Sequence, residues 1–170
     1  MKKLVLTNKD ITYFVRKICN DILVSSWKPD YIVGLTRGGL IPAVMISQCL
    51  EIPMYTLHVS LRDNNSDNET NCWMSEDAYG YADRRKNILI VDDINDSGAT
   101  FNWIMDNWKS TCRPNDEDEW LGIWNNNVRF ATVVNNEASF CYVKMDYTGT
   151  LVDKSKDDVW VDFPWENWWL

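Results

Sequence analysis

The segment from Ile88 to Thr100 (ILIVDDINDSGAT) constrains the fold more than any other part of this sequence. It opens with four apolar residues, a pattern typical of a strand that is buried on both faces, as in a parallel sheet. Asp92 and Asp93 follow at the carboxyl end of that strand, where open α/β sheets bind their ligands. A small-residue turn then opens a helix with Ser97, Gly98, Ala99 and Thr100. Because a helix N-terminus favours an anion, the sequence predicts an α/β fold with a pocket for a phosphate beside a sugar diol.

Three other interpretations fit this segment less well. Asn, Asp, Ser and Gly favour turns in general, but here a strand pattern and a helix pattern flank them. A calcium loop that began at Asp93 would need Glu at its twelfth position, where Ile104 stands. A nucleoside-triphosphate loop would need a lysine after the glycine, and Ala99 follows Gly98.

The segment Val91–Thr100 resembles the motif with which type I phosphoribosyltransferases bind phosphoribosyl pyrophosphate (PRPP). The resemblance implies a central, mainly parallel sheet flanked by helices, with a small hood from the N- and C-terminal segments. It also implies that Asp92 and Asp93 handle the ribose hydroxyls and the Mg²⁺ shell, and that the turn holds the 5′-phosphate on Ser97, Gly98, Ala99 and Thr100. Asp96 matches the family carboxylate that faces N7 of the purine and is proposed as the general base.

A second segment, Tyr31–Leu40 (YIVGLTRGGL), again has the pattern of a short strand, a turn and a helix. It resembles the pyrophosphate loop of the same family, with Thr36, Arg37, Gly38 and Gly39 as the matching residues. Arg37 offers a planar cation suited to phosphate oxygens, and the glycines allow the backbone to approach a ligand closely. Relatives can hold a non-proline cis peptide here, so the Thr36–Arg37 bond is a candidate. The alternative is an ordinary turn between a strand and a helix.

A third segment, Asp158–Glu166 (DVWVDFPWE), is similar to the C-terminal hood of the 6-oxopurine phosphoribosyltransferases. The resemblance implies that Trp160 stacks on the base and that adjacent backbone, at Val161, reads the base edge. Stacking is physically reasonable because a flat π-face binds a flat base at little entropic cost. The alternative is that Trp160 belongs to the core, in a chain that has ten tryptophans.

The sequence also departs from the family pattern on the base side. Relatives usually carry a lysine after the strand that matches Arg129–Val134, and Asn136 stands in its place. Its amide can donate a hydrogen bond to the base but carries no charge, so discrimination for an oxo group would weaken. A shift in register would let Lys144 serve instead. The resemblance covers about residues 30–61 and 87–166.

Composition and charge limit the classes of partner. The formal charge of −8 argues against general binding to nucleic acids or anionic membranes, and no segment is long and apolar enough to span a membrane. The five scattered cysteines lack metal-ligand spacing, which favours free thiols and a cytoplasmic location. His58, the single histidine, matches no motif. Relatives are dimers or tetramers, so we expect a homo-oligomer.

The length of 170 residues predicts a single domain. We expect a hood from about residues 1–8 and 140–170, a lid loop at about 62–79 and an insertion at about 113–127. Thr7–Asp10 predicts a capping box before an amphipathic helix, and Phe140–Asp146 has the pattern of a strand. The aromatic tail, Trp165–Leu170, is expected to be buried against the hood or at a subunit interface, because chain ends fray unless they dock.

Together these features predict a purine phosphoribosyltransferase that uses PRPP, a nucleobase and Mg²⁺. Guanine, hypoxanthine and xanthine are the bases that the resemblance implies. Two alternatives stay open: a phosphoribosyltransferase for a different nucleobase, which Asn136 favours, and a non-catalytic regulator that senses PRPP.

Overall fold

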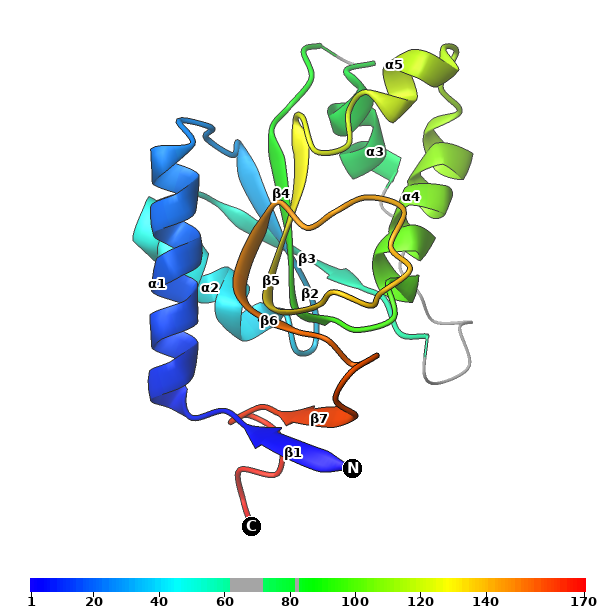
Figure 1. Cartoon of the computed structure of the whole chain (residues 1–170). Helices are drawn as coiled ribbons and strands as arrows, with labels where there is room; N and C mark the ends of the chain where they lie inside the picture. Colours follow the sequence, from blue (N-terminus) through cyan, green and yellow to red (C-terminus); the bar gives the residue numbers. More distant parts are fainter. Residues whose placement is uncertain (62–71, 82) are drawn as a thin grey trace.

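The computed structural model of the chain describes residues 1–61, 72–81 and 83–170. Its centre is a sheet of five parallel strands in the order β3-β2-β4-β5-β6 (Figure 1). These strands are β2 (Tyr31–Thr36), β3 (Met54–His58), β4 (Ile88–Asn95), β5 (Val128–Asn136) and β6 (Tyr147–Val152). The order places the acidic strand β4 in the middle, between β2 and β5. The α/β fold with a mainly parallel sheet is therefore confirmed.

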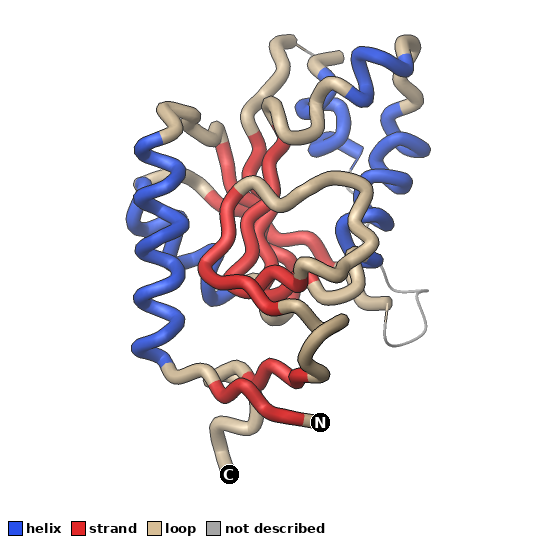
Figure 2. Tube along the Cα trace, in the orientation of Figure 1, coloured by secondary structure: helices blue, strands red, loops and turns tan. Residues whose placement is uncertain are grey.

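Helices cover both faces of this sheet (Figures 1 and 2). One face is covered by α1 (Asn8–Val24) and α2 (Leu40–Leu50), and the other by α3 (Cys72–Tyr79), α4 (Ala99–Cys112) and α5 (Glu117–Leu121). Ile88 and Ile90 of β4 pack with α3 and α4, whereas Leu89 and Val91 pack with α1 and α2. Both faces of the strand are buried, which explains its uninterrupted apolar run.

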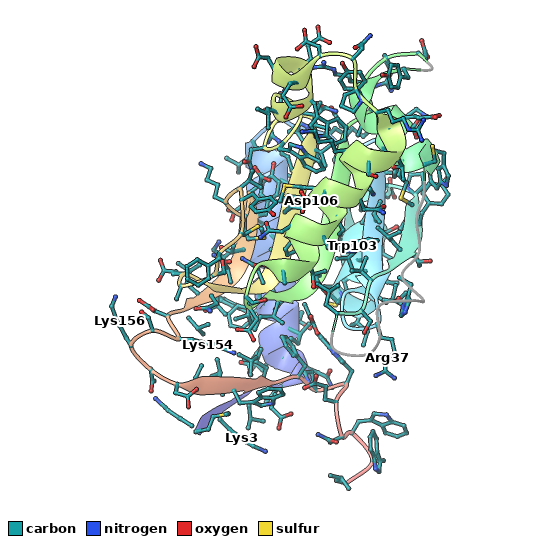
Figure 3. The ribbon with its side chains drawn as sticks, turned by 90° about the vertical axis from the view of Figure 1, so that its right-hand side faces the viewer. Lys3, Arg37, Trp103, Asp106, Lys154 and Lys156 are labelled. Atoms are coloured by element: carbon teal, nitrogen blue, oxygen red, sulfur yellow. The ribbon has the colours of Figure 1, made fainter. Side chains whose placement is uncertain are left out.

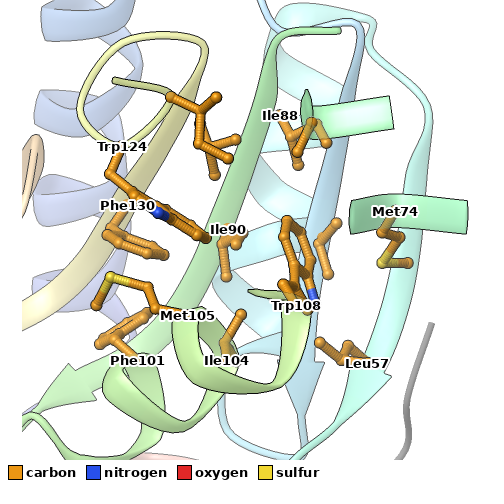
Figure 4. Packing of buried hydrophobic residues seen from close by; sticks show 14 of the residues in the cluster. Leu57, Met74, Ile88, Ile90, Phe101, Ile104, Met105, Trp108, Trp124 and Phe130 are labelled. Carbon is orange, nitrogen blue, oxygen red and sulfur yellow. The ribbon is translucent and has the colours of Figure 1, made fainter. Parts of the chain in front are cut away.

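The core on the α4 side is rich in aromatic rings (Figure 4). Trp108 of α4 is fully buried, and the ring of Trp124 stacks on that of Phe130 with 5.7 Å between centroids. Trp120 and Trp124 come from the segment predicted as an insertion, so 113–127 contributes to the core as well as to the surface. Its acidic residues, from Asp116 to Glu119, are exposed as expected.

A second, two-stranded sheet is formed by β1 (Lys2–Val5) and β7 (Val159–Asp162), which pair in parallel near the carboxyl ends of the main strands (Figure 1). The predicted capping box joins β1 to α1. The backbone N–H of Thr7 donates to the Asp10 carboxylate at 2.8 Å, and the N–H of Asp10 donates to the Thr7 hydroxyl at 3.2 Å. The small sheet matches the expected hood, but β6 belongs to the main sheet, so the C-terminal part begins later than residue 140.

Three local expectations can be compared with the structure. Residues 62–71 of the expected lid loop lie outside the described residues, and 72–79 form helix α3, because Met74 and Ala78 bury one face of that segment. The segment Phe140–Asp146 is a loop and not a strand: the N–H of Phe140 donates to the carbonyl oxygen of Ser97 in the turn before α4, and Asp146, at the end of the segment, bonds to Phe130 of β5. In the single chain, Trp168 and Trp169 of the tail are exposed and Trp165 is half-buried, so these two rings are not buried against the hood, and burial at a subunit interface stays a prediction. None of the helices in the described part of the chain is both long and apolar enough to cross a membrane.

Candidate active site

The two carboxylates at the end of β4 are held by the backbone that follows each of them. The N–H of Asp93 donates to Oδ1 of Asp92 at 2.9 Å, and the N–H of Ile94 donates to Oδ1 of Asp93 at 2.8 Å. Burial is the largest influence on Asp93 and raises the pKa of its carboxyl group above the ordinary value. The pair therefore stands at the carboxyl edge of the sheet with defined orientations.

The turn between β4 and α4 presents backbone donors. Gly98 has a φ of 89°, which favours glycine, and an added Cβ there would overlap the backbone of Cys141. No side chain caps α4 at Gly98, although the Ser97 hydroxyl accepts from the N–H of Ala99 at 3.2 Å. The first N–H groups of a helix have no partner within the helix. Backbone donors and a helix dipole in this arrangement are suited to an anion such as a phosphate.

The glycine loop after β2 packs closely against β4. The Thr36–Arg37 peptide is cis, as the resemblance indicated. An added Cβ on Gly38 would overlap the carboxylate of Asp93, and one on Gly39 would lie 2.5 Å from the carbonyl oxygen of Val91. The segments matched to the pyrophosphate loop and to the PRPP motif therefore form one site, with the exposed Arg37 at its edge (Figure 3).

His58 belongs to this site, although the sequence motifs gave it no role. Its Nδ1 lies 2.7 Å from the hydroxyl of Thr36, next to the cis peptide. The two residues are paired in the register of β2 and β3, each at the end of its strand. The sequence signal that could have indicated this contact is that β2 ends in Thr36 and the adjacent parallel strand β3 ends in His58.

Asp96 lies in an ion pair that the motifs did not predict. Nζ of Lys154, from the connection between β6 and β7, is 2.8 Å from Oδ1 of Asp96. Asn136, at the end of β5, is buried, and its Nδ2 donates to the carbonyl oxygen of Asp96 at 2.9 Å. Its Oδ1 accepts from the backbone N–H of Lys154 at 3.0 Å. Asn136 therefore links the turn after β4 to the connection before β7.

Lys144, the alternative to Asn136, lies at the other end of β5. Its carbonyl oxygen accepts from the side chain of Asn125, whose own N–H bonds to the first residue of the strand, Val128. Lys144 is therefore remote from the site at the carboxyl edge of the sheet.

The hood residues alternate between core and surface along β7. Val159 and Val161 are buried, whereas Trp160 is 38% exposed, which argues against a core role for its ring. The side chain of Val161 packs in the core beside α1, so the function predicted for this residue would fall to its backbone. The contact of Trp160 or Val161 with a base stays a prediction.

The donor set suits a metal that arrives with a substrate. Among the described residues, no group of three or more His, Cys, Asp and Glu side chains is placed to hold a metal ion. Mg²⁺ commonly takes only one or two carboxylates and completes its shell with water and substrate phosphates. Asp92 and Asp93, which lie next to the glycine loop, fit that requirement.

A cavity of about 260 Å³ lies elsewhere, between the end of α1 and the end of α2. Its lining is mostly apolar and consists of Ile22, Leu23, Ser26, Trp27, Lys28, Pro29, Leu50 and Ile52. These residues flank the amino edge of the sheet, opposite the acidic pair. The cavity holds none of the residues that the motifs single out.

Comparisons with known proteins agree with this geometry. The chain is 29% identical to a xanthine-guanine phosphoribosyltransferase of Cereibacter sphaeroides over 136 residues, which cover 79% of this chain and 68% of that protein. Its fold is similar to that of a purine phosphoribosyltransferase from Pyrococcus horikoshii, with a TM-score of 0.66, 24% identity and coverage of 98% and 96% of the two chains. It is also similar to a hypothetical protein from Neisseria gonorrhoeae with bound ppGpp, with a TM-score of 0.68, 21% identity and coverage of 97% and 89%. The model of the phosphoribosyl transferase domain matches residues 4–167, and the chain therefore belongs to the type I phosphoribosyltransferase family.

Proposed function

We propose that this protein transfers the 5-phosphoribosyl group from PRPP to a purine base, namely guanine, hypoxanthine or xanthine, and releases pyrophosphate in purine salvage. One observation carries the proposal. The acidic pair of β4, the turn at Ser97–Thr100 and the glycine loop after β2 converge at the carboxyl edge of the sheet. The site thus offers groups for a sugar diol, a phosphate and a pyrophosphate side by side.

The pyrophosphate would bind on the side of the glycine loop. Gly38 and Gly39 let the backbone approach the phosphates, and the guanidinium of Arg37 would stabilise the charge that develops on the leaving group. Bound Mg²⁺ would supply further neutralisation of that charge, with Asp92 and Asp93 as its protein ligands. Thr36, which is hydrogen-bonded to His58, would help to hold the loop in place.

The ribose and its 5′-phosphate would bind between β4 and α4. Asp92 and Asp93 accept hydrogen bonds from the ribose 2′- and 3′-hydroxyls, directly or through the metal shell. The backbone N–H groups at Ser97, Gly98, Ala99 and Thr100 hold the phosphate at the start of α4. Holding the sugar at both ends leaves C1 open to the attacking ring nitrogen of the base.

The base would bind on the side of the hood. Asp96 accepts the proton at N7 as N9 attacks C1, the role of a general base. Trp160 stacks on the ring, the backbone at Val161 reads its edge, and Asn136 supports the pocket from the end of β5. Two copies of the chain are proposed to associate, as relatives do.

Two measurements test the proposed function. We expect calorimetric titration with PRPP and MgCl₂ to give saturable binding, and we expect pyrophosphate release when guanine, hypoxanthine or xanthine is added. Turnover with only another nucleobase would support the first alternative. PRPP binding without turnover for any base would support the second alternative, a non-catalytic regulator that senses PRPP. In that case ppGpp, the ligand of the Neisseria protein, is the nucleotide to titrate next. A lack of PRPP binding would refute the proposal.

A further inference from the structure

We propose that Lys154 sets the preference for the base, by donating a hydrogen bond to the 6-oxo group of a purine whose N7 proton is accepted by Asp96. This inference rests on the proposed function and assigns a specificity-determining residue to the same site. The hydrogen-bond donor to the base is then Lys154, in the connection between β6 and β7. Asn136 is then a residue that positions Asp96 and Lys154.

The first support is the position of Lys154. Its ammonium lies 2.8 Å from Oδ1 of Asp96, and its side chain is only 20% exposed. Lys156, two residues further on, pairs with Asp153 and keeps 82% of its side chain exposed. In Figure 3, Lys154 lies between the body of the molecule and β7, whereas Lys156 lies at the outer edge of the loop. Lysine side chains are rarely buried without a charged partner, and the partner of the largely buried Lys154 is Asp96 of the site.

The second support is the match between the ion pair and the edge of an oxopurine. An ammonium can only donate hydrogen bonds, and a carboxylate can only accept them. Lys154 and Asp96 therefore present a donor beside an acceptor. An oxopurine with a proton on N7 presents the opposite order, a donor at N7 beside an acceptor at O6. Adenine carries an amino donor at that position, which would face the ammonium donor.

The third support is the rigidity of the arrangement. The single amide of Asn136 bonds to the backbone of both partners, at the Asp96 carbonyl oxygen and at the Lys154 N–H. The backbone N–H and the hydroxyl of Ser155 both donate to Oδ1 of Asp153, so the loop beside Lys154 is held without the side chain of Lys156. Arg37 lies on the other side of the carboxyl edge in Figure 3, so the two cations serve separate parts of the substrates.

The experiment compares three variants: Lys154→Met, which removes the charge, Lys154→Arg, which keeps it, and Lys156→Met as the matched control in the same loop. For each, kcat/KM is measured with hypoxanthine, guanine and adenine, and KM is measured for PRPP. We expect Lys154→Met to lower kcat/KM for the two oxopurines by roughly 10- to 100-fold, the usual cost of a lost base contact, without lowering it for adenine. KM for PRPP stays unchanged, Lys154→Arg retains the oxopurine preference, and Lys156→Met behaves like the wild type.

An equal loss for adenine and the oxopurines, an unchanged preference, or an effect on the KM for PRPP alone would overturn the inference. Circular dichroism checks folding, and Lys154→Gln replaces Lys154→Met if that variant does not fold. If the wild type turns over no base, the proposed function fails, and the inference is then tested by calorimetry with GMP and AMP. It requires tighter binding of GMP in the wild type and loss of that difference in Lys154→Met. The absence of a GMP preference refutes it.

Discussion

At the scale of single residues, Gly39 shows how closely the two loops of the site approach each other. We expect Gly39→Ala to lower the free energy of unfolding by about 1–3 kcal/mol, because its Cβ would press on the carbonyl oxygens of Val91 and Leu35 at 2.5 and 2.7 Å. Urea unfolding measures the change. Gly122→Ala is the control, since its Cβ would come no closer than 3.3 Å to another atom, at the Asp118 carbonyl oxygen. Equal costs at the two positions would contradict this account of the loop.

Asp96 provides the residue-scale test of the chemistry. If it is the general base, Asp96→Asn should lower kcat by about 10²- to 10⁴-fold, because the amide cannot take the N7 proton. The affinity for PRPP should be retained, since the ribose and phosphate groups are proposed to bind to other residues of the site. Steady-state kinetics and calorimetry measure the two quantities. Unchanged turnover would remove Asp96 from the role of general base.

At the scale of elements, the cap of α1 connects the small sheet to the main body. Thr7→Ala should lower the free energy of unfolding by about 0.5–2 kcal/mol, because the N–H of Asp10 loses its acceptor. Thr12→Ala is the matched control, since the Thr12 hydroxyl only donates to the carbonyl oxygen of Asn8 within the same helix. Chemical unfolding of both variants at neutral pH makes the comparison, and a larger cost for Thr12→Ala would contradict it.

The same cap has a predictable dependence on pH. Hydrogen bonds from the backbone N–H and the hydroxyl of Thr7 lower the pKa of Asp10 below its ordinary value of 3.8. A carboxyl group with a lowered pKa in the folded state stabilises the fold above the unfolded pKa and loses that effect as the pH falls through the folded value. The difference between wild type and Thr7→Ala should therefore be complete above about pH 5 and shrink in acid. Unfolding curves at several pH values check this, and a difference that grows in acid would contradict it.

The largest loss of stability from a single substitution is expected at Trp108 of helix α4. Trp108 is fully buried between α3 and the sheet, and Trp108→Ala should cost about 3–5 kcal/mol of unfolding free energy. Trp168→Ala removes the same side chain from a position that is 76% exposed and should change stability by less than about 0.5 kcal/mol. Thermal and urea unfolding measure both variants. A comparable loss for Trp168→Ala would show that the tail is docked in solution.

The elements that the sequence predicts well are those that local patterns determine. The buried run of β4, the helix Leu40–Leu50 and the capping box at Thr7 each follow from periodicity or spacing within about a dozen residues. The turn after β4 and the glycine loop after β2 could be matched to family motifs, because each is continuous in the chain, and their ligand roles stay a proposal. The convergence of these two loops also follows from the rule that ligands bind at the carboxyl edge of a parallel sheet.

The features that the sequence did not predict depend on contacts between distant segments. Lys154 meets Asp96 only because the path of the connection after β6 returns to the turn after β4. His58 meets Thr36 only through the register of β2 and β3. The exposure of the tail could not be inferred from its aromatic content, because burial depends on a surface that receives it and not on hydrophobicity alone.

At the scale of the whole molecule, the net negative charge governs solubility. The chain carries a formal charge of −8 at pH 7 and has a sequence pI of about 4.6. We expect a solubility minimum near pH 4.6, because repulsion between molecules vanishes where the net charge is zero. Turbidity measured from pH 3.5 to 8 checks this, and maximal turbidity near neutral pH would contradict it.

The pairing of β1 with β7 sets an order of assembly during synthesis. Lys2 lies opposite Val159, so the first strand leaves the ribosome long before its partner exists. The strands that precede the glycine loop and the turn before α4, β2 and β4, are neighbours and are both complete by residue 95. Contacts between distant segments close late, because the intervening chain must first be ordered. A nascent chain would therefore complete the two loops that are proposed to bind the sugar phosphate before it forms the small sheet on the proposed base side.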